Sequence, residues 1–387
     1  EQNLPFVIYC KPNSDLTIGL FQNTDELHQL IDFAKEGFVF APFESGIPCF
    51  FPKDKVEIVS EIIKHEELSS EVNFEREDIS EKLNFENLIS KAISKIKLGI
   101  CQKIVVSRKE EIFINSFDIE TSFKKGLLLY PTAFRYCMFH PKIGLWIGAT
   151  PEQLLQVNEN EINTVALAGT RLKDIASEWK VKEKKEQQVV TDYILENISP
   201  FVVETTISEP YTVTAGNIQH IKTDISAKMN SESSLKNIID ILHPTPAVCG
   251  YPKDKALDFI LKNENYKRSF YTGYLGELNY CFKTNKLLTS DLFVNLRCMQ
   301  IKDTKAEVFV GCGITIDSNL RFYKQYLSKS PNTKICDFSQ NIVILEIKVD
   351  VEDEIYIKEV LKNIPFIPRR FSKYCESIRK SVFNEYS

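Results

Sequence analysis

Two glutamates and one lysine stand where their side chains could do acid–base or metal chemistry. Glu152 follows the apolar run 145–150, Lys103 opens the β-branched run 104–106, and Glu186 lies in a segment with helical spacing. A lysine removed from water binds its proton less tightly and can act as a general base near neutral pH. Carboxylate oxygens are suitable ligands for hard cations. The pattern indicates a site for an anionic substrate and a cation.

The segment 145–198 would position the two acidic groups. Two β-prone runs, 145–157 and 162–171, flank a short polar break and predict a hairpin. Helical spacing follows, and it puts Glu186, Val190 and Tyr193 on one face. We expect that face to turn toward the protein and carry the Glu186 carboxylate inward. Taken alone, a segment this rich in charge also fits a solvated helix, which the composition favours.

The lysine and a histidine each have a structural alternative. Period two puts Lys103 on one face with Val105, so its side chain either reaches water at a strand end or faces a polar cavity. Spacing alone favours the first alternative, in which the Lys103 side chain reaches water. His243 opens the loop His-Pro-Thr-Pro, in which two prolines fix φ on either side of Thr245. A lone histidine is more often structural than catalytic.

Three later strands carry residues suited to an anion. The aromatic run 270–277 contains two glycines, which mark a bulge or a close approach by a ligand. The run 291–297 ends in Arg297, whose guanidinium suits carboxylates. The run 308–314 is interrupted by glycines whose N–H groups could reach an anion. Its G-x-G is weak evidence for a dinucleotide site, because no βαβ pattern surrounds it.

Composition excludes several classes of protein. The 387 residues are 43% hydrophobic and 26% charged with a net charge of −5, which gives no general attraction to nucleic acid or acidic membranes. The ten cysteines form no C-x-x-C pair, so we expect reduced thiols in a cytoplasmic protein. No leader pattern and no apolar run near 18 residues is found, so we expect neither secretion nor membrane spanning.

The rest of the chain offers structure rather than chemistry. Residues 1–60 predict short strands at 6–9 and 37–40 and a helical segment near 26–35. Residues 61–83 are rich in charge and predict a solvated helix or linker. Apolar spacing from Asn84 predicts a helix that ends at Gly99, and a second short helix is predicted at 235–242.

Eight motifs occur in an order that resembles a known family. They are Lys103-Ile-Val-Val-Ser-Arg, Gly148-Ala-Thr-Pro-Glu152, Ala166-Leu-Ala-Gly-Thr-Arg171, Glu183-x-x-Glu186, His243-Pro-Thr-Pro-Ala, Tyr271-Thr-Gly, Asn295-Leu-Arg297 and Gly311-Cys-Gly-Ile. The chain resembles the chorismate-utilising enzymes: isochorismate synthase, salicylate synthase, anthranilate synthase component I and aminodeoxychorismate synthase. The resemblance implies an α/β (α+β) fold in which two large, mainly antiparallel β-sheets stack as a sandwich with helices outside.

Within that family, two positions report the nucleophile. Aminodeoxychorismate synthases carry a nucleophilic lysine just before the Gly-Thr turn, where this chain has Ala168. Anthranilate synthases usually have glutamine at the position of Lys103, whereas the enzymes that use water have lysine. Lys103 together with Ala168 therefore implies water as the nucleophile, and an isochorismate synthase that serves menaquinone or siderophore biosynthesis.

The resemblance also assigns roles. Lys103 would be the general base, with a lowered pKa, and Glu152 the general acid, with a pKa raised by burial. The resemblance assigns the remaining positions to Mg²⁺ (Glu186 and Glu183), to the enolpyruvyl carboxylate (Tyr271, Arg297 and Gly311) and to the ring of chorismate (Gly169, Thr170 and His243). Salicylate synthase, which differs by a later pyruvate elimination, is the alternative enzyme.

The chain departs from the family after its glycine motif. There the family carries two glutamates three residues apart that complete the magnesium site, and here the positions fall near Tyr323 and Tyr326. A non-catalytic or damaged homologue is therefore a second class of function. We expect three parts: an N-terminal part at 1–83, the chorismate-binding catalytic core at 84–318, and an atypical tail at 319–387.

Overall fold

The computed structural model describes residues 3–44, 46–63, 79–114, 117–172, 178–215, 218–302, 304–317, 320–322, 338–340 and 344–348. The chain forms two compact units. The first comprises Glu1–Arg76, Lys109–Val248 and Asn265–Val310, and the second comprises Glu77–Arg108, Cys249–Glu264 and Gly311–Ser387. Because both units are discontinuous in sequence, β7 (Lys103–Phe113) and β21 (Lys305–Asp317) each begin in one unit and end in the other.

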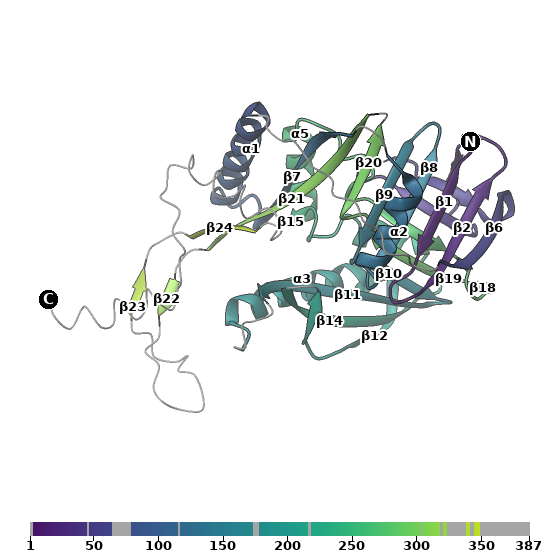
Figure 1. Ribbon diagram of the computed structural model, residues 1–387. Helices are drawn as coiled ribbons and strands as arrows, with labels where there is room; N and C mark the ends of the chain where they lie inside the picture. Colours follow the sequence, from purple (N-terminus) through teal and green to yellow (C-terminus); the bar gives the residue numbers. More distant parts are fainter. Residues whose placement is uncertain are drawn as a thin grey trace. The chain divides into compact units, whose positions relative to one another are not determined.

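The first unit is built on two antiparallel sheets. Along its first sheet the strands follow one another as β21, β20 (Cys298–Lys302), β9 (Gly144–Thr150), β8 (Phe134–His140), β1 (Phe6–Cys10), β2 (Leu16–Gln22) and β6 (Val56–Ile62). The second sheet runs β12 (Val202–Ile207), β14 (Ile218–Met229), β11 (Glu161–Leu172), β10 (Gln153–Asn158), β19 (Thr289–Val294), β16 (Tyr274–Leu278), β4 (Gly37–Ala41), β5 (Cys49–Pro52) and β3 (His28–Gln29). Strand β13 (Tyr211–Ala215) pairs with β14, and β17 (Tyr280–Cys281) with β18 (Lys286–Leu287). Figure 1 shows β1, β2, β8 and β9 side by side, with β11, β12 and β14 in the second sheet.

Stacked aromatic rings join the two sheets of this unit. Tyr9 lies 5.4 Å from Phe134 within the first sheet and 5.0 Å from Phe38 of the second. Phe134 in turn stacks on Phe293 of the second sheet at 4.5 Å. Large rings that pack face to face remove much apolar surface from water and fix the spacing of the layers. The predicted fold of two stacked, mainly antiparallel sheets is confirmed.

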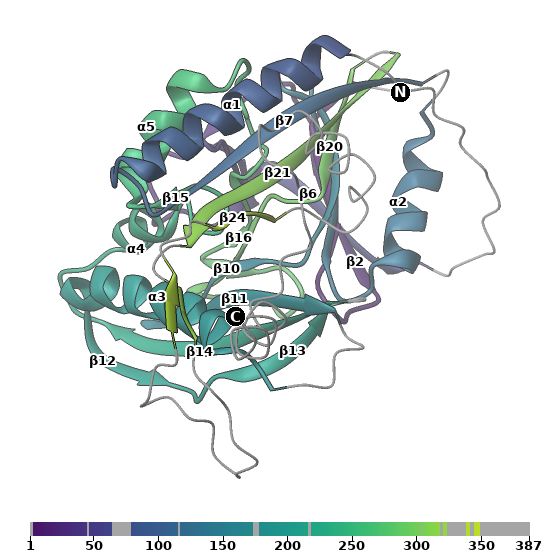
Figure 2. The same ribbon diagram turned by 90° about the vertical axis from the view of Figure 1, so that its left-hand side faces the viewer.

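Helices of the first unit pack on these sheets. Helix α2 (Ile119–Leu129) buries Phe123 and Leu127 against a face of the first sheet that includes Cys137 and Ile147. Helix α3 (Val181–Ile198) packs against β11 and β14 (Figure 2). The short helix α4 (Leu235–Leu242) begins at a Ser234 capping box, and the 3₁₀ turns are η1 (Lys53–Lys55) and η2 (Ser199–Phe201).

The second unit contains the remaining described elements. They are α1 (Ile79–Lys97), the first half of β7, β15 (Gly250–Tyr251), α5 (Lys253–Asn263), the second half of β21, β22 (Leu320–Phe322), β23 (Phe338–Gln340) and β24 (Ile344–Lys348). Strand β15 pairs with β7, and β24 pairs with β21. Figure 2 shows α1 and α5 along one side of β7.

Several predicted elements agree with the structure, and three differ. The helix at 235–242, the helix that ends before Gly99 and the pairing of β10 with β11 are confirmed. The run 145–157 is wrong as one strand, because β9 lies in the first sheet and β10 in the second. The strand predicted at 270–277 begins only at Tyr274, after a turn in which Thr272 has a φ of 59°. The predicted linker falls largely on 64–78, outside the described residues.

The helix predicted near 26–35 is the third error. That segment contains strand β3 instead, which pairs with β5. The carbonyls of Phe33 and Lys35 accept hydrogen bonds from Asn279 Nδ2 at 2.7 and 3.0 Å. The backbone is thus satisfied by a residue far along the chain, and local spacing could not report that contact.

A buried charge cluster connects the two sheets. The Lys11 ammonium lies 2.6 Å from Glu277 Oε2 and 3.0 Å from Asp291 Oδ2. The Tyr9 hydroxyl donates to Glu277 Oε1 at 2.5 Å, and Gln153 Nε2 donates to Asp291 Oδ1 at 2.8 Å. Burial lowers the pKa of Lys11, but the charges of Asp291 and Glu277 outweigh it, so the net shift is upward.

Removal of this cation should destabilise the protein strongly. In Lys11→Met, the Glu277 carboxylate, which is 1% exposed, would lose its counter-ion. Breaking a buried pair in this way costs about 3–5 kcal/mol of the free energy of unfolding. Lys124→Met is the control, because Lys124 pairs with Glu120 on the surface and should lose less than about 1 kcal/mol. Equal losses in urea unfolding would contradict a structural role for the cluster.

Candidate active site

Glu152 lies where the chain crosses from one sheet to the other. Strand β9 ends at Thr150 in the first sheet, and β10 begins at Gln153 in the second. The Glu152 carbonyl accepts a hydrogen bond from the Val294 amide at 2.9 Å, and its own amide donates to Thr150 Oγ1 at 3.4 Å. The side chain is half-buried. Both sheets therefore determine where this carboxyl group lies.

Gly169 forms a bulge in β11. The register with β14 shifts between Ala168 and Thr170, and Gly169 has a φ of 71°. A Cβ at this position would lie 3.1 Å from Glu183 Cβ and 3.3 Å from Ile221 Cδ1. Only glycine adopts this backbone conformation without strain and leaves this space. The bulge thus brings the predicted residues Gly169 and Glu183 into contact, and Thr170 follows it.

Helix α3 holds both predicted metal ligands. Its buried residue Gln187 donates to Thr191 Oγ1 at 2.9 Å and to Thr223 Oγ1 of β14 at 2.6 Å. These bonds fix the rotation of the helix against the sheet, and Glu183 and Glu186 are both half-buried. The structure thus agrees with an inward face rather than a solvated helix.

The chemistry of these side chains fits a hard cation. Among the residues that the structure describes, Glu183 Oε2 is buried and has no hydrogen-bond partner, which is unfavourable unless a cation or a ligand meets it. Mg²⁺ is usually bound by one or two carboxylates, with water and substrate oxygens as its other ligands. Glu183 and Glu186 could supply those carboxylates. Within the described ranges, no group of three His, Cys, Asp or Glu side chains could hold a metal.

His243, Tyr271 and Arg297 also lie in the first unit. His243 ends α4, and its Nε2 lies 3.1 Å from the Thr272 carbonyl. Tyr271 is buried and stacks on Phe309 with a centroid distance of 4.8 Å. Arg297 is exposed and has a φ of 47°, a strained conformation for a side chain of its size. Such strain is often found at ligand sites, and the carbonyl of Arg297 is held by the Ala149 amide at 3.1 Å.

Lys103 and Gly311 belong to the second unit. Lys103 is half-buried at the start of β7, where Tyr251 of β15 pairs with it. Its Cε lies 3.8 Å from the point where Gly313 would carry a Cβ. The glycines of β21 therefore leave room for the Lys103 side chain. The strand continues into Ile104 and Val106, both fully buried.

Sequence reasoning missed two partners of the segment around Glu152. Thr245 Oγ1 donates to Glu152 Oε1 at 3.3 Å, and Gln153 donates to Asp291 in the charge cluster. The fixed φ values around Thr245 were a signal that its side chain is held in place. No sequence signal relates Asp291 to Gln153, because 138 residues separate them.

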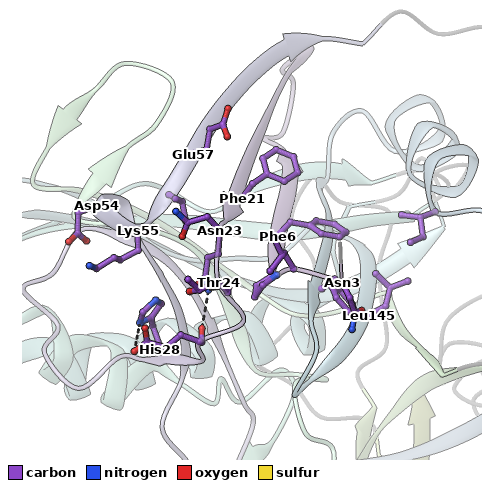
Figure 3. A pocket seen from close by; sticks show the side chains of 17 residues that line it. Asn3, Phe6, Phe21, Asn23, Thr24, His28, Asp54, Lys55, Glu57 and Leu145 are labelled. Carbon is purple, nitrogen blue, oxygen red and sulfur yellow. Dashed lines mark hydrogen bonds and ion pairs between the residues drawn. The ribbon is translucent and has the colours of Figure 1, made fainter. Parts of the chain in front are cut away.

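A hollow of about 1260 Å³ opens among the N-terminal strands of the first unit. Figure 3 shows Phe6 and Phe21 in its middle, with Asp54 and Lys55 at one end. None of the residues that line it belongs to the predicted site. We therefore assign it no part in the chemistry.

Comparison with known protein families agrees with the motifs of the sequence. A sequence model described as chorismate binding enzyme matches residues 52–321, which is well over half of the chain. The chain belongs to the chorismate-binding enzyme family. The predicted resemblance is confirmed, and Lys103, Glu152 and the other predicted site residues all lie within the matched part.

Named relatives of this chorismate-binding enzyme are isochorismate synthases. The salicylate biosynthesis isochorismate synthase of Pseudomonas aeruginosa is 28% identical over 249 residues, which cover 62% of this chain and 51% of that protein. Isochorismate synthase MenF of Pasteurella multocida is 29% identical over 245 residues, covering 58% and 54%. The chain thus spans little more than half the length of these curated relatives. The structure of menaquinone-specific MenF from Escherichia coli has a TM-score of 0.67 at 18% identity, covering 81% of this chain and 83% of that chain, and supports the fold.

A second family model matches the C-terminal part of this chorismate-binding enzyme. It is described as a VTC domain and matches residues 310–382, so the two matches overlap at 310–321, within and just after β21. Tyr323 and Tyr326 lie outside the described residues. The predicted division at 83 and 318 stays a prediction. No helix in the described part is long and apolar enough to cross a membrane.

We expect this chain to bind Mg²⁺ weakly. Glu183 and Glu186 alone place less negative charge around a divalent cation than they would together with the two further glutamates that the family resemblance implies. Calorimetric titration with Mg²⁺ in the presence of chorismate should give weak heats that Glu186→Gln abolishes. Glu196→Gln, an exposed position on the same helix, should leave them unchanged. Tight stoichiometric binding that survives Glu186→Gln would show that other residues form the metal site.

Proposed function

We propose that this protein is an isochorismate synthase, which isomerises chorismate by adding water at C2 and removing the hydroxyl group at C4. The proposal depends on the presence of both Lys103 and Ala168 in the sequence. Ala168 stands directly before the Gly169 bulge and offers no amine. Lys103 is half-buried beside Gly313, and an amine of this kind can serve as the general base that takes a proton from water. Membership of the family and the names of the relatives support the same reaction.

Two proton transfers make up the reaction we propose. Lys103 takes a proton from water, whose oxygen then bonds to C2 of the ring while the double bonds shift. The hydroxyl group on C4 leaves from the opposite face, and hydroxide is a poor leaving group unless it is protonated. Glu152 gives it that proton, so one water enters and one leaves. The backbone bonds of Glu152 to both sheets support this role, because a general acid must be held within reach of its target.

Other residues would hold the substrate. Arg297, with Tyr271 and the backbone at Gly311, would bind the enolpyruvyl carboxylate. The ring would lie against Gly169, Thr170 and His243. Glu186 and Glu183 would hold Mg²⁺, which when bound stabilises the negative charge of the ring carboxylate. The unpartnered Glu183 Oε2 supports that assignment.

Menaquinone or siderophore biosynthesis would use the product, and the protein would act in the cytoplasm without nucleic acid or membrane partners. Salicylate synthase is the alternative enzyme, because pyruvate elimination from isochorismate would complete that reaction. A non-catalytic chorismate-binding homologue is the second class, and it is favoured because the positions of the family's glutamates fall near Tyr323 and Tyr326.

Lys103→Ala should abolish isochorismate formation and leave the fold intact. Loss of a general base lowers the rate by about two to four decades. A coupled isochorismatase assay measures the rate, and circular dichroism checks the fold. Lys91→Ala on the exposed side of α1 is the control and should behave as the parent protein. Near-normal turnover without Lys103 would rule out its role as the base.

Product analysis tests the choice of nucleophile. Incubation with chorismate, Mg²⁺ and ammonium should give isochorismate, with or without salicylate, and no appreciable anthranilate, because the site offers a base for water and no amine at Ala168. Liquid chromatography separates the three products. Anthranilate as the main product would overturn the assignment to water.

A further inference from the structure

Glu152 is one of the residues that line a small cavity. The cavity has a volume of about 40 Å³ and is formed by β10, β11, α3, the end of α4 and the loop that follows it. Most of its lining is apolar, from Leu154, Leu167, Val190, Ile194, Leu242 and Ala247. Among the described residues that line the cavity, the titratable side chains are those of Glu152 and Tyr193. Apolar surroundings disfavour the charged form of a carboxyl group.

Thr245 brings a hydroxyl group to this apolar lining. Its Oγ1 donates to Glu152 Oε1 at 3.3 Å. The other threonine of the cavity, Thr164, is directed elsewhere, because its hydroxyl donates to the Leu154 carbonyl at 2.8 Å. One oxygen of the Glu152 carboxyl group therefore has a defined donor from the protein.

The loop that carries Thr245 is held at both ends. His243 donates its amide to the Ile239 carbonyl at 2.8 Å, and its ring lies edge-on to Tyr274 with centroids 5.0 Å apart. On the far side, the Val248 amide donates to the Thr245 carbonyl at 3.1 Å, and the buried Arg268 donates to the Val248 carbonyl at 2.9 Å. A hydroxyl on a loop fixed in this way loses little freedom when it bonds, so the contact is geometrically defined.

We propose that Thr245 is a positioning residue that holds the carboxyl group of Glu152 in one orientation by donating a hydrogen bond to Oε1. This inference rests on the proposed role of Glu152 as general acid. A carboxyl group can carry its proton on either oxygen, and only one oxygen can face the leaving group. Because Thr245 donates to Oε1, it limits rotation of the carboxyl group and so holds it in one orientation toward the leaving group. A donor to the charged form also opposes the effect of the apolar cavity.

The contact can be tested without turnover. The pKa of Glu152 can be measured by ¹³C NMR titration of protein labelled at the glutamate δ-carbon, with the signal assigned by its loss in Glu152→Gln. Thr245→Val keeps the shape of the side chain and removes the hydroxyl, so the pKa of Glu152 should rise by about one unit. Thr245→Ser keeps the hydroxyl and should restore it. Thr164→Val removes a hydroxyl from the same cavity and should leave the pKa of Glu152 unchanged.

Kinetics separates this inference from the proposed function. With Thr245→Val, kcat should fall about tenfold with KM little changed, and the basic limb of kcat/KM should move to higher pH. An unchanged Glu152 pKa in Thr245→Val, or an equal shift in Thr164→Val, would overturn the role of Thr245. If the pKa shifts as expected and the parent protein forms no isochorismate, the contact stands and the proposed function fails.

Discussion

The ammonium of Lys11 between two carboxylates is the interaction on which much of the first unit depends. It lies between strands of both sheets, because Lys11 follows β1 while Glu277 and Asp291 come from β16 and β19. Asp291 also accepts from Gln153, the residue next to Glu152. A charge cluster of this kind is costly to build and costly to break. The same charge cluster therefore joins the two sheets and contacts the residue next to the candidate general acid.

Local patterns predicted helices and strands well where neighbouring residues determine them. Helix α4 has a capping box and strong helical spacing, and β11 alternates between buried and half-buried residues from Ile162 to Leu167, so both could be identified from neighbouring residues. The segment near 26–35 could not, because Asn279 satisfies its carbonyls from more than 240 residues away. The division of 145–157 between two sheets was missed for the same reason. The strand with which a given strand pairs depends on tertiary structure, which local sequence patterns do not report.

The candidate site shows the same division. Residues whose side chains could do acid–base or metal chemistry, such as Lys103, Glu152 and Glu186, could be named from the sequence. Gly169 could be placed in a turn. The geometry could not be predicted, because it depends on approach between distant segments: Gly169 against Glu183, and Gly313 against Lys103. Thr245 was noticed for its prolines, but its bond to Glu152 depends on how α4 ends beside β10.

The bulge at Gly169 also bears on how such a site could change during evolution. Position 169 tolerates no side chain, since its backbone has a φ of 71° and Glu183 lies against it. Its neighbour, Ala168, precedes the bulge and is not bound by that constraint. A lineage could therefore exchange small and amine-bearing residues at 168, and with them its nucleophile, while the neighbouring glycine stayed fixed. The bulge separates a position that excludes side chains from one that does not within a single peptide bond.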